Sequence, residues 1–128
     1  MRLLLDTHAA LWWMNADKRL SAPARKAIAS LENERTLSIA AAWEMAVKSS
    51  LGRLKLPLPF GSFLAEHLPQ SRIAVIAITI RDLARVEMLP FHHRDPFDRL
   101  MAAQALERSL TVVSVDPIFE QYGVDRVW

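Results

Sequence analysis

The chain has 128 residues, the length of one ordinary domain, and its 52% hydrophobic and 23% charged composition is that of a folded protein. Sixteen Lys and Arg against fourteen Asp and Glu leave a net charge of +2, which permits a nucleic-acid partner without requiring one. Cysteine is absent, which excludes disulfides, thiolate metal sites and a thiol nucleophile, and no apolar run approaches the ~20 residues that span a membrane. We expect a single soluble, cytoplasmic domain over residues 1–128.

Segments of strand length alternate with amphipathic segments of helix length along the chain. In chain order we expect a strand at 2–5, helices at 8–15 and 22–33, a strand at 36–38, helices at 40–51 and 60–68, a strand at 73–76, helices at 80–87 and 96–108, and strands at 111–115 and 124–127. Several of these strands are apolar on both faces, as buried parallel strands are. The pattern predicts an α/β protein: a three-layer α/β/α sandwich with a mainly parallel central sheet.

Two acids follow predicted strands directly. Asp6 comes after "RLLL", and Asp116 comes after "TVVSV". In an open parallel sheet the ligand crevice lies outside the carboxyl ends of the strands, so we expect both carboxylates in one site at that edge. Each also has a local alternative, because an Asp between a strand and a helix is a good N-cap, and Pro117 after Asp116 fits that pattern.

A third acid, Glu44, lies in a segment of a predicted helix that is otherwise apolar from Ala40 to Val47. An ionised carboxylate is costly to bury unless it is paired or binds a metal ion, so Glu44 needs a partner. Lys48 is one alternative, since Glu followed four residues later by Lys is the favourable order for a helical ion pair. The two interpretations are compatible, because Lys48 can orient Glu44 at a metal site.

The stretch "HHRDPFDRLMAAQA" over residues 92–105 carries two further acids. Asp95 stands before Pro96 and is expected to cap the helix that follows. Asp98 falls in the first helical turn, where the helix dipole favours a carboxylate, and it is the expected site acid. A share in the site for Asp95 stays open. His92 and His93 are weak candidates for metal ligands, because adjacent histidines in a loop commonly point in different directions.

Four carboxylates gathered in one site repel one another unless a cation lies among them. Asp6, Glu44, Asp98 and Asp116 offer only oxygen ligands, which suits Mg²⁺ or Mn²⁺. Such a metal activates water and stabilises charge on a phosphodiester, so the predicted chemistry is phosphodiester hydrolysis without a side-chain nucleophile. Candidates for contacts with a phosphate or a ligating water, each with a purely structural alternative, are Thr7, Lys48, Arg53, Arg94, Arg99 and Ser114.

These motifs resemble the PIN-domain ribonucleases, and among them the VapC-type toxins of bacterial toxin–antitoxin pairs. The resemblance is carried over the whole chain by "LLLDTHAALWW", "LSIAAAWEMAVKSSLGRLKL", "HHRDPFDRLMAAQAL" and "TVVSVDPIFEQYGV", in the family's order. It implies one PIN-like domain over residues 1–128 that cleaves RNA with Mg²⁺ or Mn²⁺ held by the same four acids, with Thr7 and Ser114 beside them. It also implies a homodimer and inhibition by a small cognate antitoxin that inserts into or covers the active-site groove.

Two other classes of protein fit parts of the pattern. A phosphoacceptor receiver module is also a small α/β protein with acids at strand ends and bound Mg²⁺, but it places its phosphoacceptor Asp after the third strand, where "RIAVIAI" has none. A phosphatase of the haloacid-dehalogenase type needs an acid two residues after Asp6, where this chain has His8. A non-catalytic RNA-binding or antitoxin-binding protein of the same fold is the remaining alternative.

Overall fold

A single five-stranded sheet forms the centre of the computed structural model, which describes residues 1–128. Every neighbouring pair of strands is parallel, and their order across the sheet is β3-β2-β1-β4-β5. The strands are β1 (Arg2–Leu5), β2 (Glu34–Ser38), β3 (Ile73–Ile76), β4 (Thr111–Val113) and β5 (Arg126–Val127). The predicted parallel sheet is therefore confirmed.

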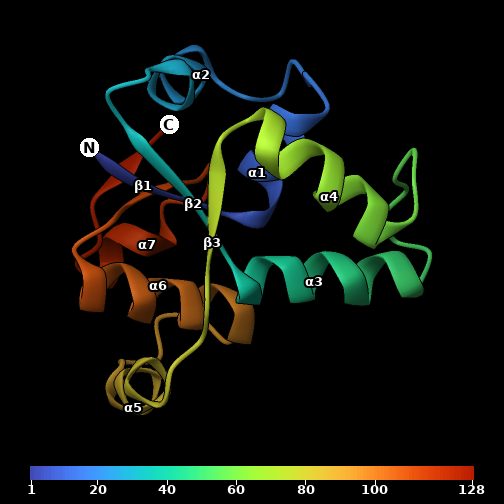
Figure 1. Cartoon of the computed structure of the whole chain (residues 1–128). Coiled ribbons are helices and arrows are strands. Elements are labelled where there is room, and N and C mark those ends of the chain that lie inside the picture. The colour runs from blue at the N-terminus through green and yellow to red at the C-terminus, as the bar shows by residue number, and fades with distance from the viewer.

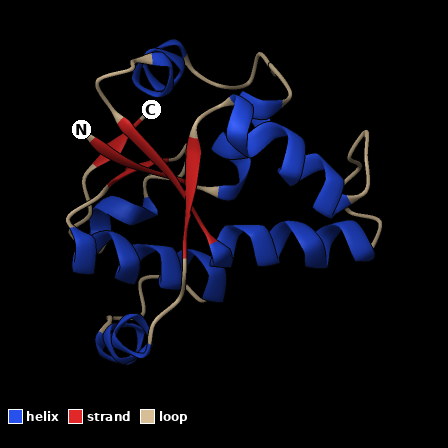
Figure 2. Cartoon of the chain, in the orientation of Figure 1, coloured by secondary structure: helices blue, strands red, loops and turns tan.

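Helices cover both faces of the sheet, as Figures 1 and 2 show. They are α1 (Thr7–Met14), α2 (Ala22–Ala29), α3 (Ile39–Ser50), α4 (Phe60–Gln70), α5 (Ile80–Met88), α6 (Pro96–Arg108) and α7 (Ile118–Gln121). In Figure 1, α1, α2 and α4 lie on one side, and α6 and α7 lie on the other, with α5 packed outside α6. Helix α3 continues from the carboxyl end of β2 and contacts α1, α4 and α6. This arrangement confirms the three-layer sandwich.

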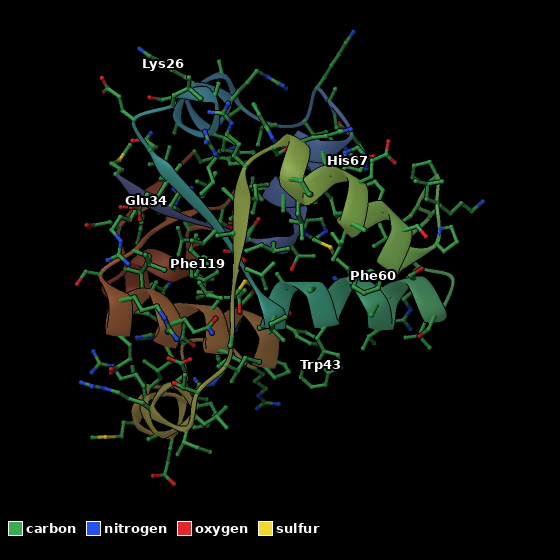
Figure 3. All side chains as sticks on the ribbon, in the orientation of Figure 1. Lys26, Glu34, Trp43, Phe60, His67 and Phe119 are labelled. Carbon is green, nitrogen blue, oxygen red and sulfur yellow. The ribbon has the colours of Figure 1, made fainter.

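None of these helices has both the length and the apolar character that a membrane-crossing segment needs. The interior is instead that of a sheet buried between helices. Leu3, Leu4 and Leu5 of β1 have no exposed surface, because both faces of this central strand are covered. Phe63 of α4 and Phe119 of α7 fill the space on either side and are the bulkiest side chains buried so completely, and Figure 3 shows the place of Phe119. The apolar packing holds the carboxyl end of β1 in place.

The second predicted helix, 22–33, ends one turn earlier than expected. Helix α2 stops at Ala29, because Ser30 leaves the helical region with φ −66° and ψ 123°. The side chain of Asn33 donates to the carbonyl of Ala27 (2.9 Å), and its oxygen accepts from the N-terminal ammonium group (2.8 Å). A short polar side chain that bonds the backbone in this way competes with helical hydrogen bonding.

The C-terminal strands are also shorter than the expected 111–115 and 124–127, and α7 is an addition to the expected elements. Asp116 begins this helical segment by accepting a hydrogen bond from the amide of Ile118 (2.9 Å). Four residues are too few to display a helical period in the sequence. The bounds of the remaining elements agree with the predictions to within two residues.

The register of the sheet brings two site candidates to one point of its edge. Leu5 of β1 pairs with Val113 of β4, and the amide of Asp6 donates to the carbonyl of Val113 (3.1 Å). Asp6 and Ser114 therefore leave the sheet side by side. The chain runs outward from β1 to β3 and then returns to β4, so β1 and β4 flank the point where strand order reverses. Open parallel sheets bind ligands at this switch point.

Candidate active site

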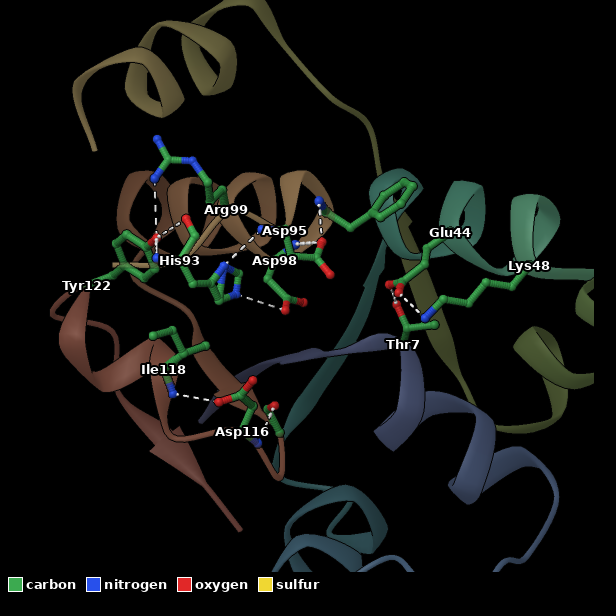
Figure 4. A network of polar contacts seen from close by, with 12 residues as sticks. Thr7, Glu44, Lys48, His93, Asp95, Asp98, Arg99, Asp116, Ile118 and Tyr122 are labelled. Carbon is green, nitrogen blue, oxygen red and sulfur yellow. Dashed lines mark hydrogen bonds and ion pairs between the residues drawn. The ribbon is translucent and has the colours of Figure 1, made fainter. Parts of the chain in front are cut away.

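A cavity of about 260 Å³ opens at the switch point, and we call it the carboxylate cavity. All four acids predicted for the site line it, and the side chains of Thr7, His8, Lys48 and Asp95 complete most of its wall. These residues come from the end of β1 and the start of α1, from α3, from the start of α6 and from the segment after β4, which are far apart in the sequence. Figure 4 shows Glu44, Asp98 and Asp116 with the groups that hydrogen-bond to them. The predicted convergence of the acids is therefore present in the fold.

Asp6 lies both at the start of a helix and in the wall of the cavity. Its Oδ1 accepts from the amide of Ala9 (2.7 Å) and caps α1, and its carboxyl group also lines the cavity. Burial raises the pKa of the Asp6 carboxyl, against hydrogen bonds from Ser114 and Ala9 that lower it, and the charge of Glu44 adds to the rise. The cap explains the position of this residue, whereas its raised pKa reflects above all the burial of its carboxyl group.

Glu44 of α3 is buried, and both of its oxygens have partners. Lys48 Nζ contacts Oε2 at 2.6 Å, which confirms the predicted ion pair. The hydroxyl of Thr7 donates to Oε1. Thr7 follows Asp6 at the start of α1, so this bond joins two of the elements that carry site acids. The pairing leaves Lys48 with its charge already offset by Glu44.

Asp95 caps α6 as the sequence predicted, and Asp98 lies in the cavity wall. Asp95 Oδ1 accepts from the amides of Phe97 (2.9 Å) and Asp98 (3.2 Å) and caps α6, although this carboxyl group also borders the cavity. Asp98, one turn into the helix, makes no such backbone contact. Its Oδ2 lies 3.1 Å from Nε2 of His93.

His93 is a functional candidate that the sequence interpretation undervalued. Its Nδ1 accepts from the amide of Asp95 (3.1 Å), so the network places the ring proton of neutral His93 on Nε2, which donates to Asp98. The His93 amide donates to the hydroxyl of Tyr122 (3.2 Å). The bond from Asp95 orients the ring of His93, and the bond to Tyr122 holds its backbone. The position of His93 two residues before the capping Asp95 is the only signal in the sequence, and it is a weak one.

The prediction that Arg99 contacts a phosphate is corrected by the structure. Its guanidinium is buried, and it donates to the carbonyls of Val86, Leu89 and Pro90 and to the Tyr122 hydroxyl. Arg99 points away from the cavity that Asp98 lines, because adjacent helical residues lie about 100° apart around the helix axis. It therefore fastens the loop before α6 and, through Tyr122, supports His93.

Asp116 lies after β4, as predicted, whereas Ser114 was expected inside that strand and follows its last residue. The Asp116 amide donates to Ser114 Oγ (3.0 Å), and Asp116 Oδ1 accepts from the amide of Ile118 (2.9 Å). One ligand atom each from Asp116, Asp98 and His93 lie within 4.8 Å of one another. Because Nε2 of His93 carries its proton toward Asp98, the carboxylates are the available ligands of this group. Arg94 is exposed and does not border the cavity, so its phosphate contact stays a prediction.

The electrostatics of the cavity favour a divalent cation. Burial, followed by the charges of Asp95, Glu44, Asp6 and Asp116, raises the pKa of Asp98 from 3.8 to about 7. The one cationic side chain in the wall, Lys48, is paired with Glu44. The donors are carboxylate oxygens, which is the set that Mg²⁺ and Mn²⁺ prefer. The residues present therefore fit such an ion.

Comparison with known proteins agrees with the fold and with the resemblance. Residues 3–125 match the PIN domain family. The chain is 36% identical over 120 residues to Ribonuclease VapC22 of Mycobacterium tuberculosis (strain ATCC 25618 / H37Rv), covering 89% of this chain and 86% of that protein. Its fold is similar to that in the crystal structure of VapBC2 from Rickettsia felis bound to a promoter DNA fragment, with a TM-score of 0.74 and 17% identity over 98% of this chain and 97% of that chain. It is also similar to that in the crystal structure of FitAcB from Neisseria gonorrhoeae, with a TM-score of 0.65 and 21% identity over 97% of this chain and 95% of that chain. The chain belongs to the PIN-domain family and, within it, to the VapC ribonucleases.

Proposed function

We propose that this protein is an endoribonuclease that hydrolyses phosphodiester bonds of RNA with Mg²⁺ or Mn²⁺ held by Asp6, Glu44, Asp98 and Asp116. The observation that carries the proposal is the convergence of these four acids, from separate elements, on one cavity of about 260 Å³. The raised pKa of Asp98 supports it, because a carboxyl group this perturbed in a cavity is typical of a functional site. The 36% identity to a protein named a ribonuclease supports the substrate.

The surrounding side chains hold the acids rather than attack the substrate. A bound Mg²⁺ or Mn²⁺ supplies activation of water and neutralisation of charge on the phosphodiester. Thr7 and Lys48 fix the two oxygens of Glu44, and His93 fixes Asp98. The Thr7 hydroxyl, the one alcohol in the cavity wall, is committed as a donor to Glu44. Hydrolysis by water therefore fits these residues better than a covalent intermediate does.

The topology disfavours the receiver-module alternative. A receiver domain has the strand order 2-1-3-4-5, with its third strand in the middle of the sheet. Here β3 is an edge strand, and the segment that follows it begins with Ala77 and carries no acid before Asp82. Asp82 is buried against Arg108 in α6, with contacts of 2.6 and 2.9 Å, and does not border the cavity.

We also propose that the protein is the toxin of a toxin–antitoxin pair and that it forms a homodimer. The structures that share its fold include complexes named VapBC. Apolar side chains stand exposed on two helices, among them Trp43 of α3 at 55% and Ile80 and Met88 of α5 at 81% each. Figure 3 shows Trp43 on the outer side of α3. Exposed apolar groups of this size are typical of protein-binding surfaces.

The test is RNA cleavage by the purified protein, freed of any partner, with Mg²⁺, with Mn²⁺ and with EDTA. We expect cleavage with either metal, none with EDTA, and none from Asp6→Asn or Asp98→Asn. Asp95→Asn keeps a capping side chain and is the matched control, with activity expected to remain. A protein that binds RNA but leaves it intact under every condition is the non-catalytic alternative, and equal activity in all three variants would overturn the assignment of the acids.

A further inference from the structure

A second cavity, of about 510 Å³, lies beside the carboxylate cavity. The two share Thr7, His8 and Lys48 in their walls, so they form one continuous depression. The second cavity extends from there between α1 and the turn that follows α3, and Arg53 lies in its wall. We call it the Arg53 cavity. An RNA strand bound at the carboxylate cavity can therefore continue past Lys48 into the Arg53 cavity.

The charge of the Arg53 cavity is opposite to that of the carboxylate cavity. Four cationic side chains line it, and two of them are already paired: Lys48 with Glu44, and Arg19 with Asp17 at 2.7 Å. Arg53 and Lys55 are exposed and take part in none of the ion pairs or side-chain hydrogen bonds of the structure. Two uncompensated cations therefore face a space that adjoins a site for phosphodiester chemistry.

The end of α3 holds Arg53 in that wall. Gly52, with φ +70°, ends the helix, the amide of Arg53 donates to the carbonyl of Lys48 (2.9 Å), and the amide of Gly52 donates to that of Ser49 (3.1 Å). These two bonds are a Schellman motif, in which the side chains at the positions of Lys48 and Arg53 lie next to each other and are frequently apolar. In this chain both are cationic. The helix ending thus places Arg53 beside the lysine that borders the acids.

One wall of the Arg53 cavity is aromatic. The half-buried ring of Trp12 lies 5.6 Å from the ring of His8, centroid to centroid, and the Arg19 guanidinium lies 5.2 Å from the Trp12 centroid. Planar rings of this kind stack on unpaired bases, whose faces are hidden inside a duplex. Cations with an aromatic wall are the combination found where proteins bind single-stranded nucleic acid.

We propose that the Arg53 cavity binds an unpaired nucleotide of the RNA next to the bond that is cleaved, with Arg53 and Lys55 on its backbone phosphates and Trp12 and His8 beside its base. The inference rests on the proposed ribonuclease function and adds to it a separate binding site for one nucleotide of the RNA. An acidic protein segment would pair with Arg53 and Lys55, but it has no bases to stack on Trp12 and His8. The cavity therefore acts in substrate affinity, while the carboxylate cavity acts in hydrolysis.

The test compares Arg53→Ala/Lys55→Ala with Arg81→Ala/Arg85→Ala, which removes the same charge from α5, outside both cavities. Each pair is placed in the Asp98→Asn background, and binding of a short labelled RNA in Mg²⁺ is followed by fluorescence anisotropy, as a single strand and as a duplex. We expect the Arg53→Ala/Lys55→Ala pair to weaken binding of the single strand about tenfold. The slope of the logarithm of the binding constant against the logarithm of the salt concentration should become less steep by about 1.4, because each phosphate that is no longer neutralised contributes about 0.7. The α5 pair should change neither.

Kinetics separate this inference from the function on which it rests. In the otherwise native chain, the Arg53→Ala/Lys55→Ala pair should raise KM for single-stranded RNA and leave kcat nearly unchanged. Cleavage with an unaltered KM and salt slope would overturn the inference and leave the ribonuclease function standing. An equal loss of single-strand and duplex binding would overturn it too, as would a loss confined to binding of a partner protein. Absence of cleavage by the unaltered protein is instead a failure of the proposed function.

Discussion

Asp98→Asn should make the metal-free protein more stable at neutral and alkaline pH while it abolishes RNA cleavage. The folded-state pKa of Asp98 is about 7, against 3.8 for an unperturbed group. Folding therefore favours the protonated carboxyl, and ionisation of Asp98 lowers the free energy of unfolding. This destabilisation is absent below pH ~4, grows as the pH rises, and is complete above pH ~7. Removal of the charge removes this destabilisation, because Asn is close to Asp in size and still accepts a hydrogen bond from His93.

The size of the effect follows from the same shift. About three pKa units correspond to an upper limit of about 4 kcal/mol at 1.36 kcal/mol per unit. The side chain is 22% exposed and has a donor in His93, so solvent screening and relaxation reduce the measurable gain to about 1–2 kcal/mol. A gain in stability of this size on mutation is unusual, since most substitutions destabilise.

The assay is urea unfolding in EDTA at several pH values between 4.5 and 8, for the unaltered protein, for Asp98→Asn and for the exposed Asp125→Asn as control. The free energy of unfolding of Asp98→Asn should exceed that of the unaltered protein by an amount that increases with pH, and Asp125→Asn should show no such trend. Addition of Mg²⁺ should stabilise the unaltered protein and not Asp98→Asn. A destabilised Asp98→Asn, or a difference that does not vary with pH, would refute the electrostatic reasoning.

Substitutions at three further residues test the polar contacts that hold the structure and the cavity. His93→Ala should lower kcat about tenfold or more with normal far-UV circular dichroism, because Asp98 loses its donor, and His93→Gln should recover part of the loss. Arg99→Ala should cost about 3–5 kcal/mol in urea unfolding, since it leaves several carbonyls without their donor, and a stable variant with weaker RNA binding would restore the phosphate role. Asp82→Ala should cost about 3 kcal/mol at pH 7. Burial raises the pKa of Asp82, but hydrogen bonds from Arg108, the Thr79 amide and Gln104 outweigh it and lower the pKa to about 2. The stabilisation is therefore present above pH ~4 and is lost as the pH falls toward 2. Acid unfolding of the unaltered protein and of Asp82→Ala measures this loss.

The fold was predictable where the sequence has a long periodic or apolar pattern. Helix 96–108 and strand 2–5 agree with the structure to the residue, because Asp95 and Pro96 mark the start of the helix and three leucines form the strand. Prediction failed where a side chain overrides the pattern. Asn33 bonds the backbone of α2 and ends the helix early, and α7 is too short for periodicity to appear.

The acids that line the cavity were predictable because Asp6 and Asp116 follow strands at one sheet edge and Glu44 stands alone in an apolar helix segment. The residues that orient them were harder to predict, since they act through three-dimensional contacts. His93 reaches Asp98 across a loop whose shape depends on Tyr122, and Arg99 turns away from the cavity although it adjoins Asp98 in the sequence. When a cationic residue adjoins an acid in a motif, the sequence alone does not show which of the two side chains faces the cavity.

Asp98 is the acid whose position says most about function. Asp6 and Asp95 cap helices, Asp116 accepts a hydrogen bond from the amide of Ile118, and Glu44 is joined to Lys48 in its own helix. Local structure alone accounts for those four. Asp98 accepts from no backbone amide, its donor is His93, and its pKa is raised to about 7 by burial and by the other acids. Nothing in the folding of α6 requires a carboxylate there, and the cation of the proposed function would offset the cost in stability of its charge.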